Sequence, residues 1–161
     1  MYIQIKYIQM KIEEQLNLSN IEPLKKSILN LMYTGNWVNE KSSVYFKQFD
    51  LTSQQFNILR ILRGQNGQAI NLQDVQERMI SKMSNTTRLI EKLRKKELVR
   101  RIQCASNRRK IEISITEKGL DLLRLIDESL SAHEKETTKN LTENEAILLN
   151  ELLNKLRRNN N

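Results

Sequence analysis

The sequence predicts a mostly helical chain with one small β-hairpin. Its 161 residues include only 4 Gly and 1 Pro, and strong helix formers dominate the rest. Apolar residues recur at three- and four-residue spacing along most of the chain, which is typical of amphipathic helices. One stretch differs, because Ile111, Ile113 and Ile115 alternate with polar residues. This period of two predicts a strand with one buried face.

Length and composition favour one structural unit over residues 1–161 and exclude several classes of protein. With 1 Cys and 1 His, neither a disulfide framework nor a zinc site is expected. The chain lacks an apolar run long enough for a membrane helix and lacks a secretory signal, so we expect a cytoplasmic protein. Met1 and Met10 both remain open as the native start. No nucleophile pattern points to an enzyme, and we expect no cofactor.

The first long helix is predicted over residues 21–49. Ile21, Leu24 and Ile28 begin its apolar face, and Pro23 suits a first helical turn. Gly35 and Asn36 are expected to bend or interrupt it.

Three shorter helices follow. Thr52 and Gln55 form a capping box that starts the second helix, which ends at the glycines of residues 64–67. Residues 69–70 can pair as a minor strand. Asn71 can cap a third helix over 72–79, and Ser84 is predicted to cap the fourth.

The fourth helix is followed by the hairpin. Its strands are predicted over residues 98–104 and from 111 to 115, with the turn at 105–109. Two helices joined by a short turn form a helix-turn-helix, whose second helix reads DNA. Residues 52–116 are therefore predicted to form a winged helix-turn-helix DNA-binding unit.

The chain ends are predicted to be dimerisation helices, at residues 21–49 and 116–158. Thr116 can cap a helix that runs to about residue 131, and residues 131–140 read as either solvated helix or linking loop. Thr142 and Glu145 form a second capping box before a leucine-rich last helix. These helices carry more leucine than one small core needs. A two-fold dimer on a palindromic site explains the surplus, and coverage of the chain's own domain is the alternative.

Positive charge is concentrated around the predicted reader helix and hairpin. Between Lys82 and Lys118 there are 12 basic and 4 acidic residues, a net charge of +8 that equals the net charge of the whole chain. The remaining residues balance. Focused positive charge is typical of a protein that binds a polyanion.

These features together resemble the MarR family of winged-helix regulators. The resemblance runs from about residue 21 to residue 158. Its marks are Leu51-Thr52-x-x-Gln55-Phe56, Thr87-Arg88-Leu89-Ile90-x-x-Leu93, and Asn107-x-Arg109-x-x-x-Ile113-x-Ile115-Thr116-x-x-Gly119. The family implies a cytoplasmic homodimeric regulator, usually a repressor, often released by a small phenolic ligand or by thiol oxidation.

The resemblance also implies a set of functional residues. In the reader helix, the residues expected to meet base edges and phosphates are Ser84, Asn85, Thr87, Arg88 and Lys92. In the wing, Arg108 or Arg109 is expected to enter the minor groove. The aromatic residues Trp37, Tyr45 and Phe46 either line a pocket for a small aromatic effector or pack in the dimer core, which is the favoured interpretation.

Two positions depart from the family pattern. Asn107 stands where the family usually has Asp, which predicts a looser wing with more positive charge toward DNA. Glu97 stands where the family favours Gly. If the backbone is left-handed there, Glu97 costs about 1 kcal/mol relative to Gly.

Other functional interpretations remain. The basic face could bind an acidic protein or RNA, or the chain could be a ligand-binding scaffold without DNA activity. Cys104, near Arg100 and Arg101, is a weaker candidate for a redox switch. His133 has no evident catalytic partner in the sequence.

Overall fold

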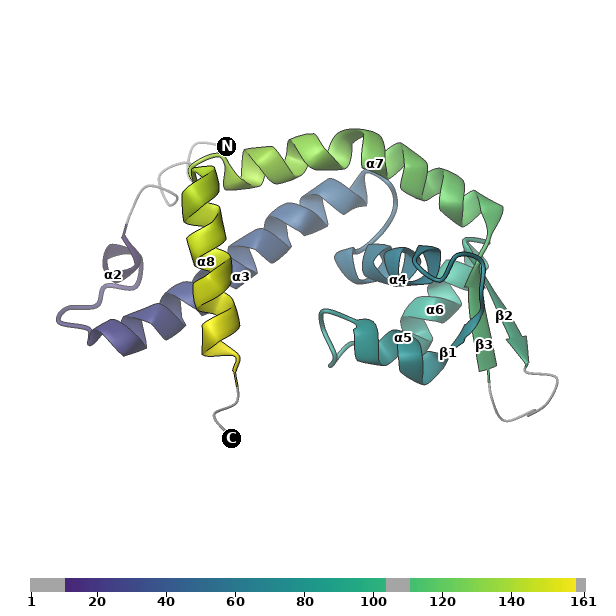
Figure 1. Cartoon of the computed structure of the whole chain (residues 1–161), viewed down its shortest axis with the longest axis horizontal. Coiled ribbons are helices and arrows are strands. Elements are labelled where there is room, and N and C mark those ends of the chain that lie inside the picture. The colour runs from purple at the N-terminus through teal and green to yellow at the C-terminus, as the bar shows by residue number, and fades with distance from the viewer. Residues whose placement is uncertain (1–10, 104–110, 159–161) are drawn as a thin grey trace. The chain divides into compact units, whose positions relative to one another are not determined.

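The computed structural model describes residues 11–103 and 111–158 (Figure 1). The chain divides into two compact units, Met1–Val44 and Tyr45–Asn161. Residues 1–10, which include both possible starts, lie outside the described residues, as do Cys104 and the wing turn with Asn107.

The first unit holds a short helix α2 (Ile12–Gln15) and most of the long helix α3 (Pro23–Lys47). Lys26 forms an ion pair with Glu13, and the Tyr33 hydroxyl donates a hydrogen bond to Gln15 Oε1 at 3.0 Å. The predicted long first helix is confirmed as α3, which continues through Gly35 and Asn36, so the helix is not interrupted there. Helix α2 was not predicted from the sequence.

The second unit begins with the last turn of α3 and contains three short helices. They are α4 (Ser53–Arg63), α5 (Leu72–Arg78) and α6 (Thr86–Lys95). The predicted capping box of α4 is confirmed, and the Asn71 side chain caps α5 by accepting a hydrogen bond from the Asp74 amide at 2.9 Å. In Figure 1 these helices lie beside the sheet.

The sheet has three antiparallel strands in the order β1-β3-β2. Strand β1 (Ile70–Asn71) is the predicted minor strand, and β2 (Val99–Gln103) and β3 (Ile111–Ile115) are the arms of the predicted hairpin. Arg101 pairs with Ile113, which fixes the register of the hairpin. Ile113 is buried, while Ile111 and Ile115 are partly buried against the same core.

Two helices complete the second unit, α7 (Glu117–Thr138) and α8 (Glu143–Leu156). The predicted caps at Thr116 and Thr142 are both confirmed. The sequence allows either a solvated helix or a linking loop at residues 131–140, and this segment is helical as far as Thr138. No residue of α8 is buried.

The core of the second unit draws on residues on both sides of the helix-turn-helix. Phe46 at the end of α3 stacks on Phe56 of α4, with ring centroids 4.2 Å apart. Leu123 and Ile126 of α7 are fully buried in the same cluster as Leu59 and Leu93. The hydrophobic core extends beyond residues 52–116 at each end. The assignment of residues 52–116 as a separate DNA-binding unit stays a prediction.

The residues that follow α6 are in close contact with the residues that begin α7. Glu97 has a φ of 63°, so the backbone there is in the left-handed conformation that favours glycine. The Glu97 carbonyl accepts a hydrogen bond from the Thr116 hydroxyl at 2.7 Å. The hydrogen bond and ion pair to Lys118, 2.8 Å away, lower the pKa of the Glu97 carboxyl. Gly119 is buried, and a Cβ there would lie 2.4 Å from the Leu98 carbonyl oxygen.

We predict that Glu97→Gly raises the free energy of unfolding by about 0.5–1 kcal/mol, because glycine relieves the left-handed backbone at little cost. The lost ion pair to Lys118 is exposed and contributes little. Denaturant unfolding measures the change. Glu97→Ala is the control, since it removes the ion pair and keeps the Cβ. If Glu97→Ala stabilises as much as Glu97→Gly, the backbone explanation is wrong.

We predict that Gly119→Ala lowers stability by about 1–3 kcal/mol, since the new methyl group meets backbone and the Ile115 side chain. Gly35→Ala is the matched control, because nothing lies within 4 Å of a Cβ built there. Alanine inside α3 is expected to stabilise by about 0.5–1 kcal/mol. Thermal unfolding should therefore shift in opposite directions for the two variants. A shift in the same direction would contradict the close approach at Gly119.

Candidate nucleic-acid interface

Helix α6 has one buried and one exposed face. Thr86, Ile90 and Leu93 recur at helical spacing and are 4%, 3% and 0% exposed. They face α4, α5 and β2, against which α6 packs. The inner face therefore fixes the rotation of α6 about its axis and determines which side chains point outward.

The start of α6 is held by Asn85, and the prediction that Ser84 is the N-cap is wrong. Asn85 Oδ1 accepts a hydrogen bond from the Arg88 amide at 3.1 Å. The Ser84 carbonyl instead accepts from the Thr86 amide at 2.9 Å and lies just before the cap. Asn85 uses its oxygen for capping, so its side-chain NH2 group remains as a donor toward solvent.

The outward face of α6 presents three of the predicted DNA-binding residues. Thr87, Arg88 and Lys92 are exposed, and within the described chain none makes a side-chain hydrogen bond or ion pair. Arg94 differs, because it donates two hydrogen bonds to Glu91, at 3.0 and 2.8 Å. This bonding lowers the pKa of Glu91 and raises the pKa of Arg94. Arg88 and Lys92 thus keep their charge available to a ligand.

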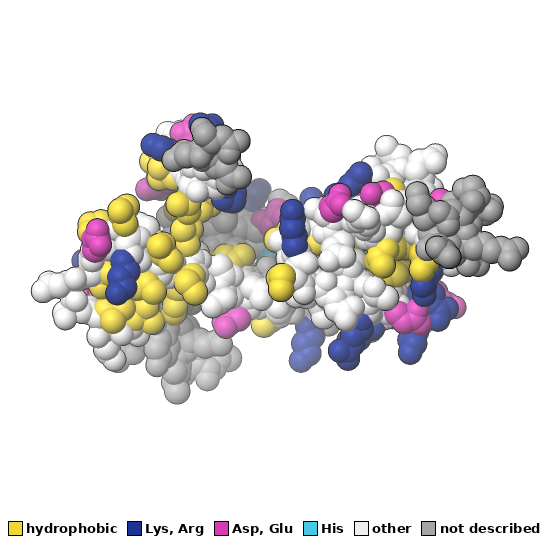
Figure 2. All heavy atoms as spheres, turned by 90° about the horizontal axis from the view of Figure 1, so that it is seen from below, with side chains coloured by type: hydrophobic (Ala, Val, Ile, Leu, Met, Phe, Trp, Pro, Cys, Tyr) yellow, Lys and Arg dark blue, Asp and Glu magenta, His cyan; other side chains and the backbone are white. Residues whose placement is uncertain are grey.

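The hairpin continues the basic surface. Arg100 and Arg101 of β2 are exposed beside the end of α6. Figure 2 shows several Lys and Arg side chains standing out from the part of the molecule that holds the helix-turn-helix. Arg108 and Arg109, the predicted minor-groove residues, lie outside the described residues, so their role stays a prediction.

The turn between α5 and α6 exposes two apolar side chains that were not singled out from the sequence. Ile80 is 86% exposed and Met83 is 97% exposed. The Ile80 amide donates to Asn57 Oδ1 at 3.0 Å, which ties the turn to α4. Apolar side chains beside a reader helix can contact thymine methyl groups. Composition gave no signal for them, because apolar residues in a short turn usually pack inward.

The three aromatic residues predicted for an effector pocket or for packing fall in different units. Trp37 is half-buried in the first unit, whereas Tyr45 and Phe46 belong to the core of the second. The Tyr45 hydroxyl donates to the Ile126 carbonyl at 3.2 Å and lies 2.8 Å from Ser129 Oγ. Its ring stacks on His133 at 4.2 Å, so His133 packs against the core. The effector pocket stays a prediction.

Two other kinds of site are absent from residues 11–103 and 111–158. These ranges contain no group of three or more His, Cys, Asp or Glu side chains placed to hold a metal ion. Within the same ranges, every helix is too short or too polar to cross a lipid bilayer.

A reader helix packed on two further helices, followed at once by an antiparallel hairpin, defines a winged helix-turn-helix protein. The model of the MarR family matches residues 51–111, which are less than half of the chain. This match covers α4, the helix-turn-helix and β2.

Two known proteins are similar to this chain. The HTH-type transcriptional regulator SarZ of Staphylococcus aureus (strain USA300) is 30% identical over 97 residues, which cover 60% of this chain and 64% of SarZ. The chain thus matches just under two thirds of the length of that relative. The crystal structure of a MarR transcription factor from Planctomyces limnophilus is 27% identical, with a TM-score of 0.67, covering 84% of this chain and 98% of that one.

A third comparison is with a complex. The crystal structure of a cysteine-to-serine mutant of MarR from E. coli, complexed with operator DNA, has a TM-score of 0.72 and 22% identity. The match covers 85% of this chain and 100% of that one. At this identity the likeness establishes the fold alone.

Proposed function

We propose that this chain is a homodimeric transcriptional regulator that binds a palindromic DNA operator, with one α6 in the major groove of each half-site. The observation that carries the proposal is the outward face of α6, where Thr87, Arg88 and Lys92 are exposed without side-chain partners in the described chain. An α-helix fits the major groove, and arginine there can make bidentate contacts with guanine.

Charge supports duplex DNA over the alternative of an acidic protein or RNA. Residues 82–118 carry the whole net charge of the chain, and they form the helix, the hairpin and the junction after it. A narrow exposed helix beside a basic hairpin fits successive grooves of a duplex. The relative solved with operator DNA has this fold, which favours the same use here. Such a regulator acts where the chromosome lies, so we place it in the cytoplasm.

Exposed apolar side chains on the terminal helices support the dimer. Helix α8 contains no buried residue, and four of its apolar side chains are 52–64% exposed: Ile147, Leu148, Leu152 and Leu156. On α3, Leu24 and Ile28 are 74% and 58% exposed. Apolar surface of this extent usually marks a protein interface. A dimer with two-fold symmetry would present two copies of α6 to one duplex.

We predict that Arg88→Ala changes base preference at one position per half-site by about 1–3 kcal/mol. Arg94→Ala is the matched control, since it removes the same charge from the same helix at a residue already paired with Glu91. Selection from random duplexes, followed by titration of the selected site, measures both. An unchanged preference in Arg88→Ala, or an equal change in both variants, would show that α6 does not read bases as proposed.

Binding to the selected duplex is also expected to weaken steeply with salt, with a slope near −0.9 for each neutralised phosphate. About six to ten contacts are expected for such a dimer. A shallow slope together with tighter binding to an acidic protein or to RNA would favour the alternative function.

We predict that the double change Leu148→Glu and Leu152→Glu produces a monomer at micromolar concentration, because two buried charges at an interface would be unpaired. Asn144→Glu is the control, since it adds a charge to α8 at an exposed polar residue. Sedimentation velocity should find the wild type and the control dimeric. A dimeric double variant, or a monomeric wild type, would remove α8 from the proposed interface.

A further inference from the structure

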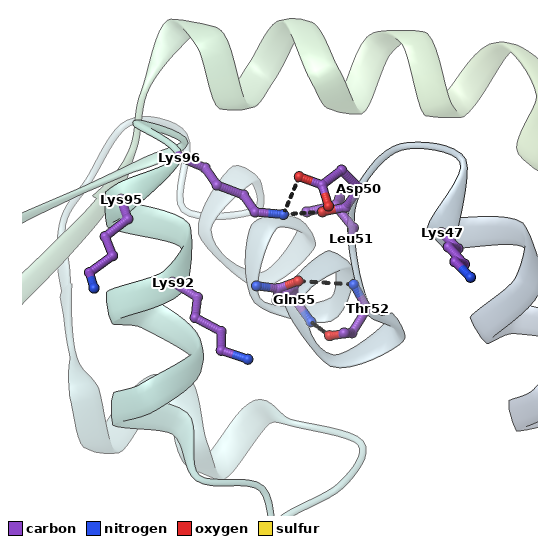
Figure 3. Close-up of a pocket in the computed structure, with 8 residues that line it drawn as sticks. All are labelled: Lys47, Asp50, Leu51, Thr52, Gln55, Lys92, Lys95 and Lys96. Carbon is purple, nitrogen blue, oxygen red and sulfur yellow. Dashed lines mark hydrogen bonds and ion pairs between the residues drawn. The ribbon is translucent and has the colours of Figure 1, made fainter.

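A cleft lies between the start of α4 and the second half of α6 (Figure 3). Four lysines line it, Lys47 from the end of α3 and Lys92, Lys95 and Lys96 from α6 and its C-cap. From the other side come Asp50, Thr52 and Gln55. All of these residues belong to the second unit, so the cleft is internal to one compact body.

The side chain of Gln55 supplies a hydrogen-bond donor at the wall of the cleft. Gln55 is only 3% exposed, and its Oε1 accepts a hydrogen bond from the Thr52 amide at 2.9 Å. The Gln55 amide in turn donates to Thr52 Oγ1 at 3.2 Å, completing the capping box. Among the described residues, no acceptor reaches Gln55 Nε2. Figure 3 shows this nitrogen directed away from Thr52, toward the side of the cleft formed by α6.

The charge around that donor is strongly positive. The Lys96 ammonium pairs with the Asp50 carboxylate at 2.8 Å and also donates to the Asp50 carbonyl. Across the described chain, Lys47, Lys92 and Lys95 form no ion pair. The first turn of α4 adds backbone N–H groups without intrahelical acceptors and the positive end of the helix dipole. The lining of the cleft therefore holds four lysines, one carboxylate and a helix N-terminus.

We propose that this cleft binds a phosphate-class anion, with Gln55 Nε2 as its fixed hydrogen-bond donor and Lys92 and Lys95 as its main cationic partners. Phosphate oxygens accept hydrogen bonds, and their negative charge would neutralise the positive charge of the lysines. The anion can come from a DNA backbone or from a free phosphate compound. In the DNA case the inference rests on the proposed function, because the cleft would then hold the backbone beside the groove that α6 reads.

The variant Gln55→Glu removes the donor and keeps the start of α4 intact. Glutamate at this position preserves a capping box with Thr52, since its carboxylate can accept from the same amide. It replaces the Nε2 donor with an acceptor and places negative charge in the cleft. Gln68→Glu is the matched control, because Gln68 is exposed and does not line the cleft.

The first experiment titrates inorganic phosphate at constant ionic strength and follows the side-chain amide signal of Gln55 by NMR, without DNA. The expected result is a saturable shift of that signal in the wild type and in Gln68→Glu, together with shifts of the Lys92 and Lys95 backbone amides. In Gln55→Glu, the Lys92 and Lys95 shifts should disappear. No saturable shift in the wild type, or equal shifts of Lys92 and Lys95 in both variants, would overturn the anion site.

The second experiment identifies the source of the anion, using salt-dependent titration of a selected duplex. If the anion is a DNA phosphate, Gln55→Glu should lower the steepness of the salt slope by about 0.9 for each cleft occupied, while Gln68→Glu leaves it unchanged. If the slopes agree while phosphate still shifts Gln55, the cleft serves a free phosphate compound. Normal DNA binding with no phosphate response would defeat this inference and leave the proposed function standing.

Discussion

The burial of one face of α6 determines which side chains of this helix are exposed to a ligand. Thr86, Ile90 and Leu93 are almost completely removed from solvent. Burying three such side chains stabilises the packed state by several kcal/mol, which is far more than any exposed ion pair contributes. The helix therefore cannot rotate, and Thr87, Arg88 and Lys92 must point outward. The charges of Arg88 and Lys92 are available to a ligand because the core, and not a surface ion pair, holds the helix in place.

Two polar junctions then fix the ends of that helix. At its start, Asn85 caps the first turn, and at its end the chain turns through the left-handed Glu97 into β2. The Thr116 hydroxyl bonds to the Glu97 carbonyl, and Thr116 also caps α7. Gly119 permits this contact because any side chain would meet the Leu98 carbonyl. One threonine thus links the reader helix, the hairpin and α7.

The sequence predicted the features that depend on local chemistry. Thr52, Asn71, Thr116 and Thr142 were each identified as caps, because their side chains act on backbone only three residues away. At the start of α6 the same reasoning chose the wrong residue, since Ser84 and Asn85 are both good caps. The structure selects Asn85, which lets Thr86 enter the core. Local preference could not decide this, because tertiary packing does.

Contacts between residues that are far apart in the chain could not be predicted from the sequence. The cleft brings Gln55 together with Lys92 and Lys95, and no periodicity relates them. Nor does the helical spacing of Trp37, Tyr45 and Phe46 on α3 show that Trp37 belongs to the first unit and the other two to the second.

The most direct test of α6 as the reader is the NMR response of the chain to a duplex selected from random DNA. We expect that backbone signals from residues 85–95 shift most, with further shifts at Arg100 and Arg101 of β2, while the exposed polar residues of α7 stay unchanged. Shifts confined to α7 or α8, with α6 unaffected at saturating duplex, would contradict the claim that α6 is the surface that meets DNA.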